Sequence, residues 1–280
     1  MKFKVTGQLG YEVTAPSTFI LNIHALRTPA QAILEETFTV EPYFKIEEFS
    51  HYTENRFIRL EVTEPTMLNI SYSALVDTSF KLTPAGQLTQ VPIADADPMV
   101  LPYIFPSRYC QSDKLFRFAN NKFGKFNNAF EKVVALTQWI HDNVEYLSGS
   151  TNSQTSAYDT VTELAGVCRD FAHLGIALCR ALDIPARYFT GYAYQLNPPD
   201  FHACFEAYLG GKWIIFDATQ LAPLNGLVKI ATGRDAADAA IASIFGNVNC
   251  LSVSSACELA DQNFEPVFYD SNNPVGLTYL

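Results

Sequence analysis

Short apolar runs typical of β-strands dominate the first hundred residues. Apolar and polar positions partly alternate over Phe57–Val62 and Met67–Tyr72, with Glu64-Pro65 between them, so these two runs are predicted to form an antiparallel pair. Residues 83–106 carry five of the fifteen prolines and almost no periodicity, which predicts a linker lying against the surface. We therefore expect a β-rich N-terminal domain over residues 1–100. Its predicted strands are Lys2–Val5, Thr18–Ala25, Ala32–Val40, Phe57–Val62 and Met67–Val76.

The pattern becomes helical after the linker. The apolar residues of Ala129–Asn143 lie mostly on one stripe, which predicts a helix packed on the core. Asp170–Leu182 is apolar on most sides and is predicted to be a buried helix. It ends before Pro185, because proline disfavours helical geometry at the residue before it. The alanine-rich residues 234–245 predict another helix, and Asn249–Leu259 predicts a further strand.

A strand and a hairpin lie between these helices. Arg187–Tyr194 is rich in aromatic residues and predicts a strand. Phe201–Leu209 and Lys212–Asp217 flank Gly210-Gly211, which is the signal of a two-residue hairpin turn. Helices followed by an antiparallel sheet are typical of the α+β class, so we expect an α+β domain over residues 107–280.

Charge and targeting signals narrow the function classes. The net charge of −10 and the lack of any Lys/Arg run argue against nucleic acid as a partner. The first residues lack the apolar core of a signal peptide, and no apolar segment reaches membrane-spanning length, so we expect a cytoplasmic protein with no membrane partner. The six cysteines show no Cys-x-x-Cys spacing, and a reducing compartment would keep them as free thiols.

Cys168 lies where a nucleophilic thiol is expected. Gly166 breaks the chain two residues before it, and the predicted buried helix begins beside it. Unpaired N–H groups and the positive end of the helix dipole favour the thiolate form at such a position. Cysteine is more often a small buried apolar residue, and that interpretation applies to Cys179, Cys204, Cys250 and Cys257.

The predicted hairpin supplies a base and an orienting carboxylate. If the turn is centred on Gly210-Gly211, residue i faces residue 421 − i, so Cys204 faces Asp217. His202 is two residues from Cys204 and therefore lies on the same face, diagonal to Asp217. A thiol, an imidazole and an orienting carboxylate are the parts of a cysteine nucleophile site. Cys168, His202 and Asp217 are the predicted catalytic residues.

Residues from about Asn127 to Gly246 resemble the core of the transglutaminase-like superfamily of cysteine enzymes, in particular its bacterial members. The resemblance is carried by Gly-Val-Cys-Arg-Asp-Phe-Ala at 166–172, Cys-Arg-Ala-Leu-x-Ile-Pro-Ala-Arg at 179–187, His202-Ala203 and Trp213…Asp217-x-Thr219. It implies a papain-like fold with the thiol on a helix and the His and Asp on an antiparallel sheet. It also implies that the triad falls on Cys168, His202 and Asp217, and that the N-terminal domain is a small β-sandwich.

The resemblance implies acyl transfer from an amide through a thioester, with a peptide or protein as substrate. If water is the acyl acceptor, the protein is a protease or amidase, and many bacterial relatives are regarded as hydrolases of this kind. If an amine is the acceptor, the protein is a transglutaminase. The family also includes peptide N-glycanases, whose zinc-binding Cys pairs are missing here, and non-catalytic assembly modules that have lost the nucleophile. Many relatives have Trp at the position of Cys204 and Pro at that of Ala218. On the predicted catalytic face, Cys204 would widen the pocket.

We expect no metal or other cofactor. His202-x-Cys204 offers two ligands without a second recognisable pair, and there is no Asp-x-Asp-x-Asp loop for calcium. The backbone N–H of Cys168 would hold the oxyanion. The sequence does not identify the second donor, for which Gln154 is a weak candidate.

Overall fold

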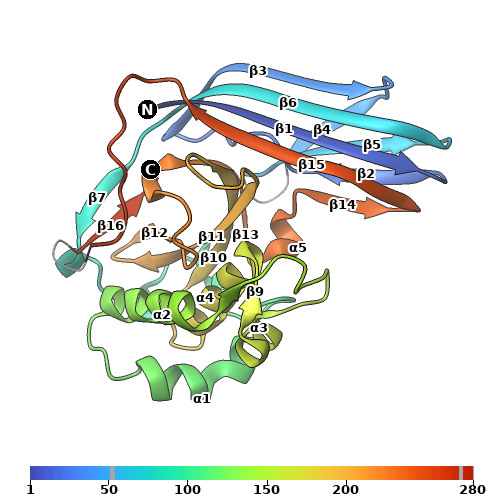
Figure 1. Cartoon of the computed structure of the whole chain (residues 1–280). Coiled ribbons are helices and arrows are strands. Elements are labelled where there is room, and N and C mark those ends of the chain that lie inside the picture. Colours follow the sequence, from blue (N-terminus) through green and yellow to red (C-terminus); the bar gives the residue numbers. More distant parts are fainter. Residues whose placement is uncertain (51–53, 271–273, 280) are drawn as a thin grey trace.

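The computed structural model describes residues 1–50, 54–270 and 274–279. Figure 1 shows a β-sandwich lying over a unit in which helices pack on an antiparallel sheet. The predicted α+β fold, with an N-terminal β-sandwich and a helix-borne Cys168 beside an antiparallel sheet, is confirmed.

The sandwich consists of two four-stranded sheets, in the orders β15-β1-β6-β3 and β14-β2-β5-β4. Their inner faces pack against each other through alternating apolar residues, such as Tyr11 and Phe19, whose ring centroids lie 5.2 Å apart. The strands are β1 (Lys2–Val13), β2 (Ser17–Leu21), β3 (Gln31–Glu41), β4 (Ile46–Ser50), β5 (Arg56–Val62), β6 (Thr66–Thr78), β14 (Ala242–Phe245) and β15 (Val248–Leu259).

Two expectations about the sandwich are wrong. The runs on either side of Glu64-Pro65 do not pair, because β5 joins β2 and β4 in one sheet while β6 joins β1 and β3 in the other. The second concerns residues 107–280, which we expected to form one domain. Instead β14 pairs with β2 and β15 with β1, so both sandwich sheets include a strand from the C-terminal part of the chain.

The second unit is built on the sheet β12-β11-β10-β13. Helix α4 packs on β11 so closely that a Cβ on Gly175 would lie 2.5 Å from the Phe205 ring. This contact explains why glycine stands in the middle of a buried helix. The elements are α1 (Ser112–Phe123), α2 (Ala129–Asn143), α3 (Ala157–Glu163), α4 (Cys168–Arg180), β10 (Ala186–Ala193), β11 (Phe201–Leu209), β12 (Lys212–Phe216) and β13 (Leu227–Gly233).

Short elements tie the two units together. The predicted linker lies against the second unit, where the N–H of Gly210 donates to Thr89 O and Tyr103 packs on Trp213. Two pairs of short strands, β7 with β16 and β8 with β9, complete the fold. Their bounds are β7 (Lys81–Pro84), β8 (Glu145–Tyr146), β9 (Ala165–Gly166) and β16 (Val275–Thr278), and single 3₁₀ turns span Ala85–Gln87, Ile93–Asp95, Leu101–Tyr103 and Leu224–Gly226.

The helix predicted over residues 234–245 is mostly wrong. Only α5 (Ala236–Ala239) is helical, and the chain then becomes strand β14. The carbonyls needed for further helical hydrogen bonds are occupied, because Thr190 Oγ1 donates to Ala239 O at 3.0 Å and Asn55 Nδ2 approaches Asp238 O at 3.4 Å. Tertiary hydrogen bonds therefore override the high helix propensity of alanine here.

Candidate active site

Cys168 is the first residue of α4, and its surroundings explain the motif around it. The Asp170 carboxylate Oδ2 accepts the N–H of Val167 at 2.9 Å and so closes the first turn of the helix. A Cβ on Gly166 would lie 2.7 Å from the Asp170 Cβ, so this capping arrangement leaves room only for glycine. The thiol is partly exposed at the positive end of the helix, as predicted.

Tyr146 lies beside Cys168, and the sequence did not predict it as a residue of the site. Parallel pairing of β8 with β9 places Tyr146 opposite Gly166, two residues before the thiol. Both the backbone N–H and the side chain of Cys168 lie near enough to influence the pKa of the Tyr146 hydroxyl. Burial and the neighbouring thiol raise the pKa of Tyr146 to about 12, so the hydroxyl keeps its proton at neutral pH. Only the non-local β8–β9 pair brings it here, so no local motif could have identified it.

His202 and Asp217 meet as the hairpin register predicted. Phe205 pairs with Phe216 and Leu209 with Lys212, which is the 421 − i rule. His202 Nε2 and Asp217 Oδ2 are 2.8 Å apart, and both side chains are buried.

Thr219 holds the carboxylate of Asp217 from its other side. Its N–H and its hydroxyl donate to Asp217 Oδ1 at 2.9 and 2.7 Å. These bonds account for the Asp-x-Thr spacing of the sequence.

The charges of this pair support each other. Burial opposes a charged imidazole, but the Asp217 carboxylate outweighs it, with smaller contributions from Cys204 and Cys168, and raises the pKa of His202 well above its usual value. Burial also opposes the charged form of Asp217 and raises its pKa, but His202 and the two Thr219 bonds lower this pKa by more. Because Nε2 is engaged by Asp217, and Nδ1 has no hydrogen-bond partner among the described residues, Nδ1 is the ring nitrogen left to serve the thiol.

Cys168 and His202 line one cleft of about 430 Å³. Its far wall is the segment from Ala236 to Ser243, which leads from α5 into the sandwich strand β14. Two expectations fail here. Cys204 is buried and does not line the cleft, so it does not widen it, and Gln154 is an exposed turn residue outside the cleft lining.

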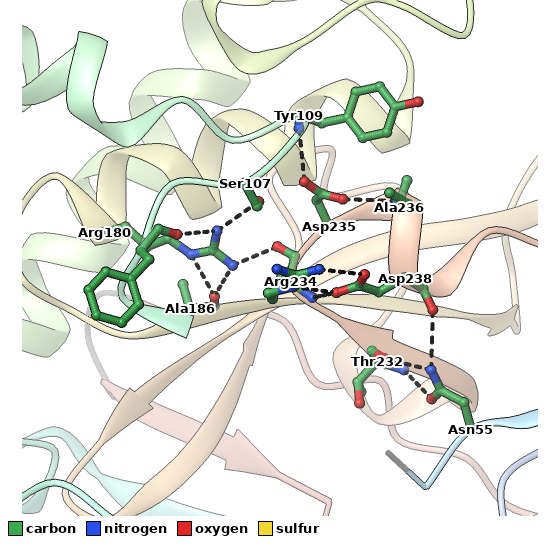
Figure 2. Close-up of polar contacts among 12 residues, drawn as sticks. Asn55, Ser107, Tyr109, Arg180, Ala186, Thr232, Arg234, Asp235, Ala236 and Asp238 are labelled. Atoms are coloured by element: carbon green, nitrogen blue, oxygen red, sulfur yellow. Dashed lines mark hydrogen bonds and ion pairs between the residues drawn. The ribbon is translucent and has the colours of Figure 1, made fainter. Parts of the chain in front are cut away.

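Hydrogen bonds to Tyr109 and to His173 of α4 hold the start of this wall in place (Figure 2). The Asp235 carboxylate accepts the N–H of Tyr109 at 2.8 Å and caps α5 through Ala237 N–H at 2.9 Å. Just behind it, His173 Nε2 accepts the N–H of Ala236 at 3.1 Å. Burial, and then the nearby arginines, lower the pKa of His173 well below its usual value, so it stays a neutral acceptor.

The sandwich and the end of α4 hold the chain just before this wall. The Asn55 side chain of the sandwich forms two hydrogen bonds with the backbone of Thr232, at 2.8 and 2.9 Å. Buried Arg180 donates to Arg234 O and to Ala186 O, both in the second unit. Hydrogen bonds from both units therefore hold the chain that leads into the wall.

Three residues that could bind a metal ion, namely His202, Cys204 and Asp217, lie close together. The donor atoms of His202, Cys204 and Asp217 lie within 4.8 Å of one another. However, the Asp217 oxygens are already engaged by His202 and Thr219, and burial raises the pKa of the Cys204 thiol to about 12. A protonated thiol and an occupied carboxylate suit a hydrogen-bonded pair better than a metal site.

Two family models match successive parts of the chain. Residues 1–99 match the bacterial transglutaminase N-terminal domain, and residues 117–218 match the transglutaminase-like superfamily. A crystal structure of a protein from Cytophaga hutchinsonii, described as a "Putative Cysteine Protease", is 61% identical. It covers all of this chain and 98% of its own, with a TM-score of 0.98. The chain belongs to the transglutaminase-like superfamily.

Relatives of this superfamily member occur in mycobacteria. An uncharacterized protein of Mycobacterium leprae is 24% identical over 258 residues, which cover 85% of this chain and 91% of that protein. An uncharacterized protein of Mycobacterium tuberculosis is 31% identical over 150 residues, covering 49% of this chain and 47% of that protein. Within the described ranges, no helix is both long and apolar enough to cross a membrane.

Proposed function

We propose that this protein is a cysteine-dependent acyl-transfer enzyme that hydrolyses amide bonds of peptides or proteins, with Cys168, His202 and Asp217 as its catalytic residues. The observation that carries the proposal is the arrangement at one cleft. A partly exposed thiol at a helix N-terminus and an imidazole line the same space, and a buried carboxylate 2.8 Å from the imidazole Nε2 orients it.

In the first half-reaction, the Cys168 thiolate attacks the amide carbonyl carbon and forms a C–S bond. The carbonyl oxygen becomes an oxyanion, which the backbone N–H of Cys168 stabilises, and the Tyr146 hydroxyl beside that N–H is the second donor. The tetrahedral intermediate then collapses and the C–N bond breaks. His202 Nδ1 gives its proton to the leaving amine. A thioester on Cys168 results.

Water completes the reaction. His202 Nδ1, now neutral, takes a proton from a water molecule that attacks the thioester carbon. The C–S bond then breaks, the carboxylic acid leaves, and the Cys168 thiolate beside the charged His202 is restored. Because Cys168 is partly exposed, water reaches the thioester directly. Asp217 orients the imidazole in both halves and stabilises its charged form.

The proposed setting is the cytoplasm, with a peptide or protein as the partner and neither nucleic acid nor membrane. All six cysteines are free, which suits a reducing compartment where Cys168 stays a thiol. The net charge of −10 disfavours binding to a polyanion.

The test is trapping of the acyl-enzyme. Purified protein is incubated with a library of peptide amides, quenched in acid and analysed by mass spectrometry, with release of free acid followed in parallel. An acyl adduct on Cys168 is expected, with acid as the product in water. Cys168→Ala should abolish both signals, whereas Cys250→Ala, which removes an exposed thiol away from the cleft, should retain them. Turnover that persists in Cys168→Ala contradicts the mechanism. Product that forms only when a primary amine is added contradicts hydrolysis and indicates transglutamination.

A further inference from the structure

Strand β14 brings a free sheet edge to the cleft that holds Cys168. It is the outermost strand of the order β14-β2-β5-β4, so its backbone pairs with β2 on one side only. Ala242 and Ser243 of this strand line the same cleft as Cys168 and His202. Figure 1 shows β14 at the rim of the sandwich that lies towards α5 and the helical unit. An unpaired edge is a ready template for another strand.

The hydrogen-bond pattern shows which groups of β14 are free. Ala242 pairs with Leu21, so Ile241 faces Asn22, and the N–H of Asn22 donates to Ile241 O at 2.9 Å. In an antiparallel ladder, pairs that exchange hydrogen bonds alternate with pairs that do not. Ser243 therefore bonds to Ile20 across the ladder. The N–H and C=O of Ala242 point away from β2.

The same alternation applies one step further along β14. Phe245 pairs with Thr18 and bonds to β2, whereas Ile244 pairs with Phe19 and does not. Ala242 and Ile244 thus present two N–H and two C=O groups at the free edge. Among the described residues, no other strand pairs with this edge.

We propose that the acyl-donor substrate is an extended peptide that binds by adding a strand to the free edge of β14, with its scissile carbonyl carried to Cys168. This inference rests on the proposed function, because the peptide is the substrate of the same thiol. Three observations favour a peptide strand as the occupant. The edge and the thiol share one cleft, four of the five residues from Ala236 to Ala240 are alanines that let a backbone approach closely, and hydrogen bonds to Thr190 and His173 hold the wall in place.

Strand addition gives the N-terminal sandwich a role in substrate binding. Main-chain hydrogen bonds to an edge recognise any extended peptide, while the side chains around the cleft select among sequences. Only alternate residues of the added strand bond to β14, because the ladder repeats every two residues. A globular or strongly helical substrate segment would have to become extended before it reacts.

The test uses a two-armed reagent, an epoxysuccinyl core with a trialanine arm on each carbonyl. The Cys168 thiolate opens the epoxide, so that a C–S bond forms, a C–O bond breaks and the alkoxide takes a proton from His202. Each arm amide is N-methylated in turn, and each inactivation rate is divided by the rate with iodoacetamide. Iodoacetamide is too small to pair with β14, so its rate reports only the reactivity of the Cys168 thiol.

Strand addition predicts that N-methylation at every second amide of one arm lowers the normalised inactivation rate by about 3- to 10-fold, because each such methyl group removes one hydrogen bond to β14. Methylation of the amides between them should have little effect on this rate. Ala242→Pro, which removes the outward N–H without touching the ladder to β2, should lower the normalised rate by a similar factor. Ala242→Ser keeps that N–H, so its normalised rate should not show this fall.

Losses that do not alternate, or equal rates for Ala242→Pro and Ala242→Ser, would overturn strand addition. The N-methyl series uses the unmodified protein, so the test stands even if the proline variant does not fold. A Cys168 that reacts with iodoacetamide only as an ordinary thiol would instead overturn the proposed function, and this inference with it.

Discussion

Glu206 lies at the centre of the second sheet, on the same strand as His202, and its charge is a strong determinant of stability. The fully buried carboxylate lies between Arg187 Nε on β10, at 2.5 Å, and Lys229 Nζ on β13, at 2.8 Å. Although burial opposes ionisation, these two cations lower the pKa of Glu206 from 4.5 to about 2. Glu206→Gln keeps the shape of the side chain and removes the charge, leaving the buried Lys229 and the partly buried Arg187 without this counter-ion.

The magnitude follows from the pKa. One pKa unit corresponds to 1.36 kcal/mol, so the depression of Glu206 contributes about 3 kcal/mol to the free energy of unfolding. Since the folded-state pKa is the lower one, this contribution is complete above pH 4.5 and is lost as the pH falls through 4.5 towards 2. At pH 7 we expect Glu206→Gln to lower the free energy of unfolding by about 3–5 kcal/mol, because one member of a buried ionic cluster is removed.

The assay is urea unfolding at 25 °C, followed by tryptophan fluorescence, at several pH values between 7 and 2. The difference between wild type and Glu206→Gln should be constant at higher pH and shrink by about 3 kcal/mol as pH 2 is approached. Glu47→Gln is the matched control, because its ion pair with Arg59 is exposed and worth at most about 1 kcal/mol. A difference that does not change with pH, or a Glu206→Gln cost no larger than that of the control, would refute the reasoning.

Three further substitutions probe the cleft. Asp217→Asn should lower kcat by about 10²- to 10⁴-fold with little change in the fold, because the imidazole of His202 loses its orienting charge; near-normal kcat in steady-state assays would contradict this role. Thr219→Val removes one of the two bonds to Asp217 and should lower kcat by several-fold, with recovery in Thr219→Ser; identical kcat values for these variants would exclude the hydroxyl. Tyr146→Phe should lower kcat by about 10²-fold with a smaller effect on KM if its hydroxyl stabilises the oxyanion, and a kcat that is unchanged or higher would show that it does not.

The local parts of this structure could be predicted from the sequence, because short-range chemistry determines them. Gly210-Gly211 have φ values of 57° and 78°, which the two-residue turn requires, and that turn fixes the register bringing His202 to Asp217. The helix of Ala129–Asn143 begins and ends at the predicted residues, and Asn128 caps it by accepting the N–H of Glu131.

The parts that were missed depend on pairing between distant residues. Nothing within residues 242–259 indicates that they join strands from the beginning of the chain, because a strand's own pattern does not name its partner. The hydrogen bonds that stop α5 come from Asn55 and Thr190, far away in sequence. Tyr146 reaches Cys168 only through a two-residue parallel pair. Strands from distant parts of the chain therefore build one wall of the cleft.

The most direct test of the central claim is the pH dependence of Cys168 alkylation by iodoacetamide, compared between wild type and His202→Ala. His202 is charged well above the pH at which a free imidazole loses its proton, so a thiolate beside it is stabilised over that range. We predict that in wild type the rate reaches its plateau well below pH 8.5, near which a free thiol ionises, and that His202→Ala moves the transition up towards that value. A transition near pH 8.5 in both proteins would contradict the account, because Cys168 and His202 would then not act as a pair.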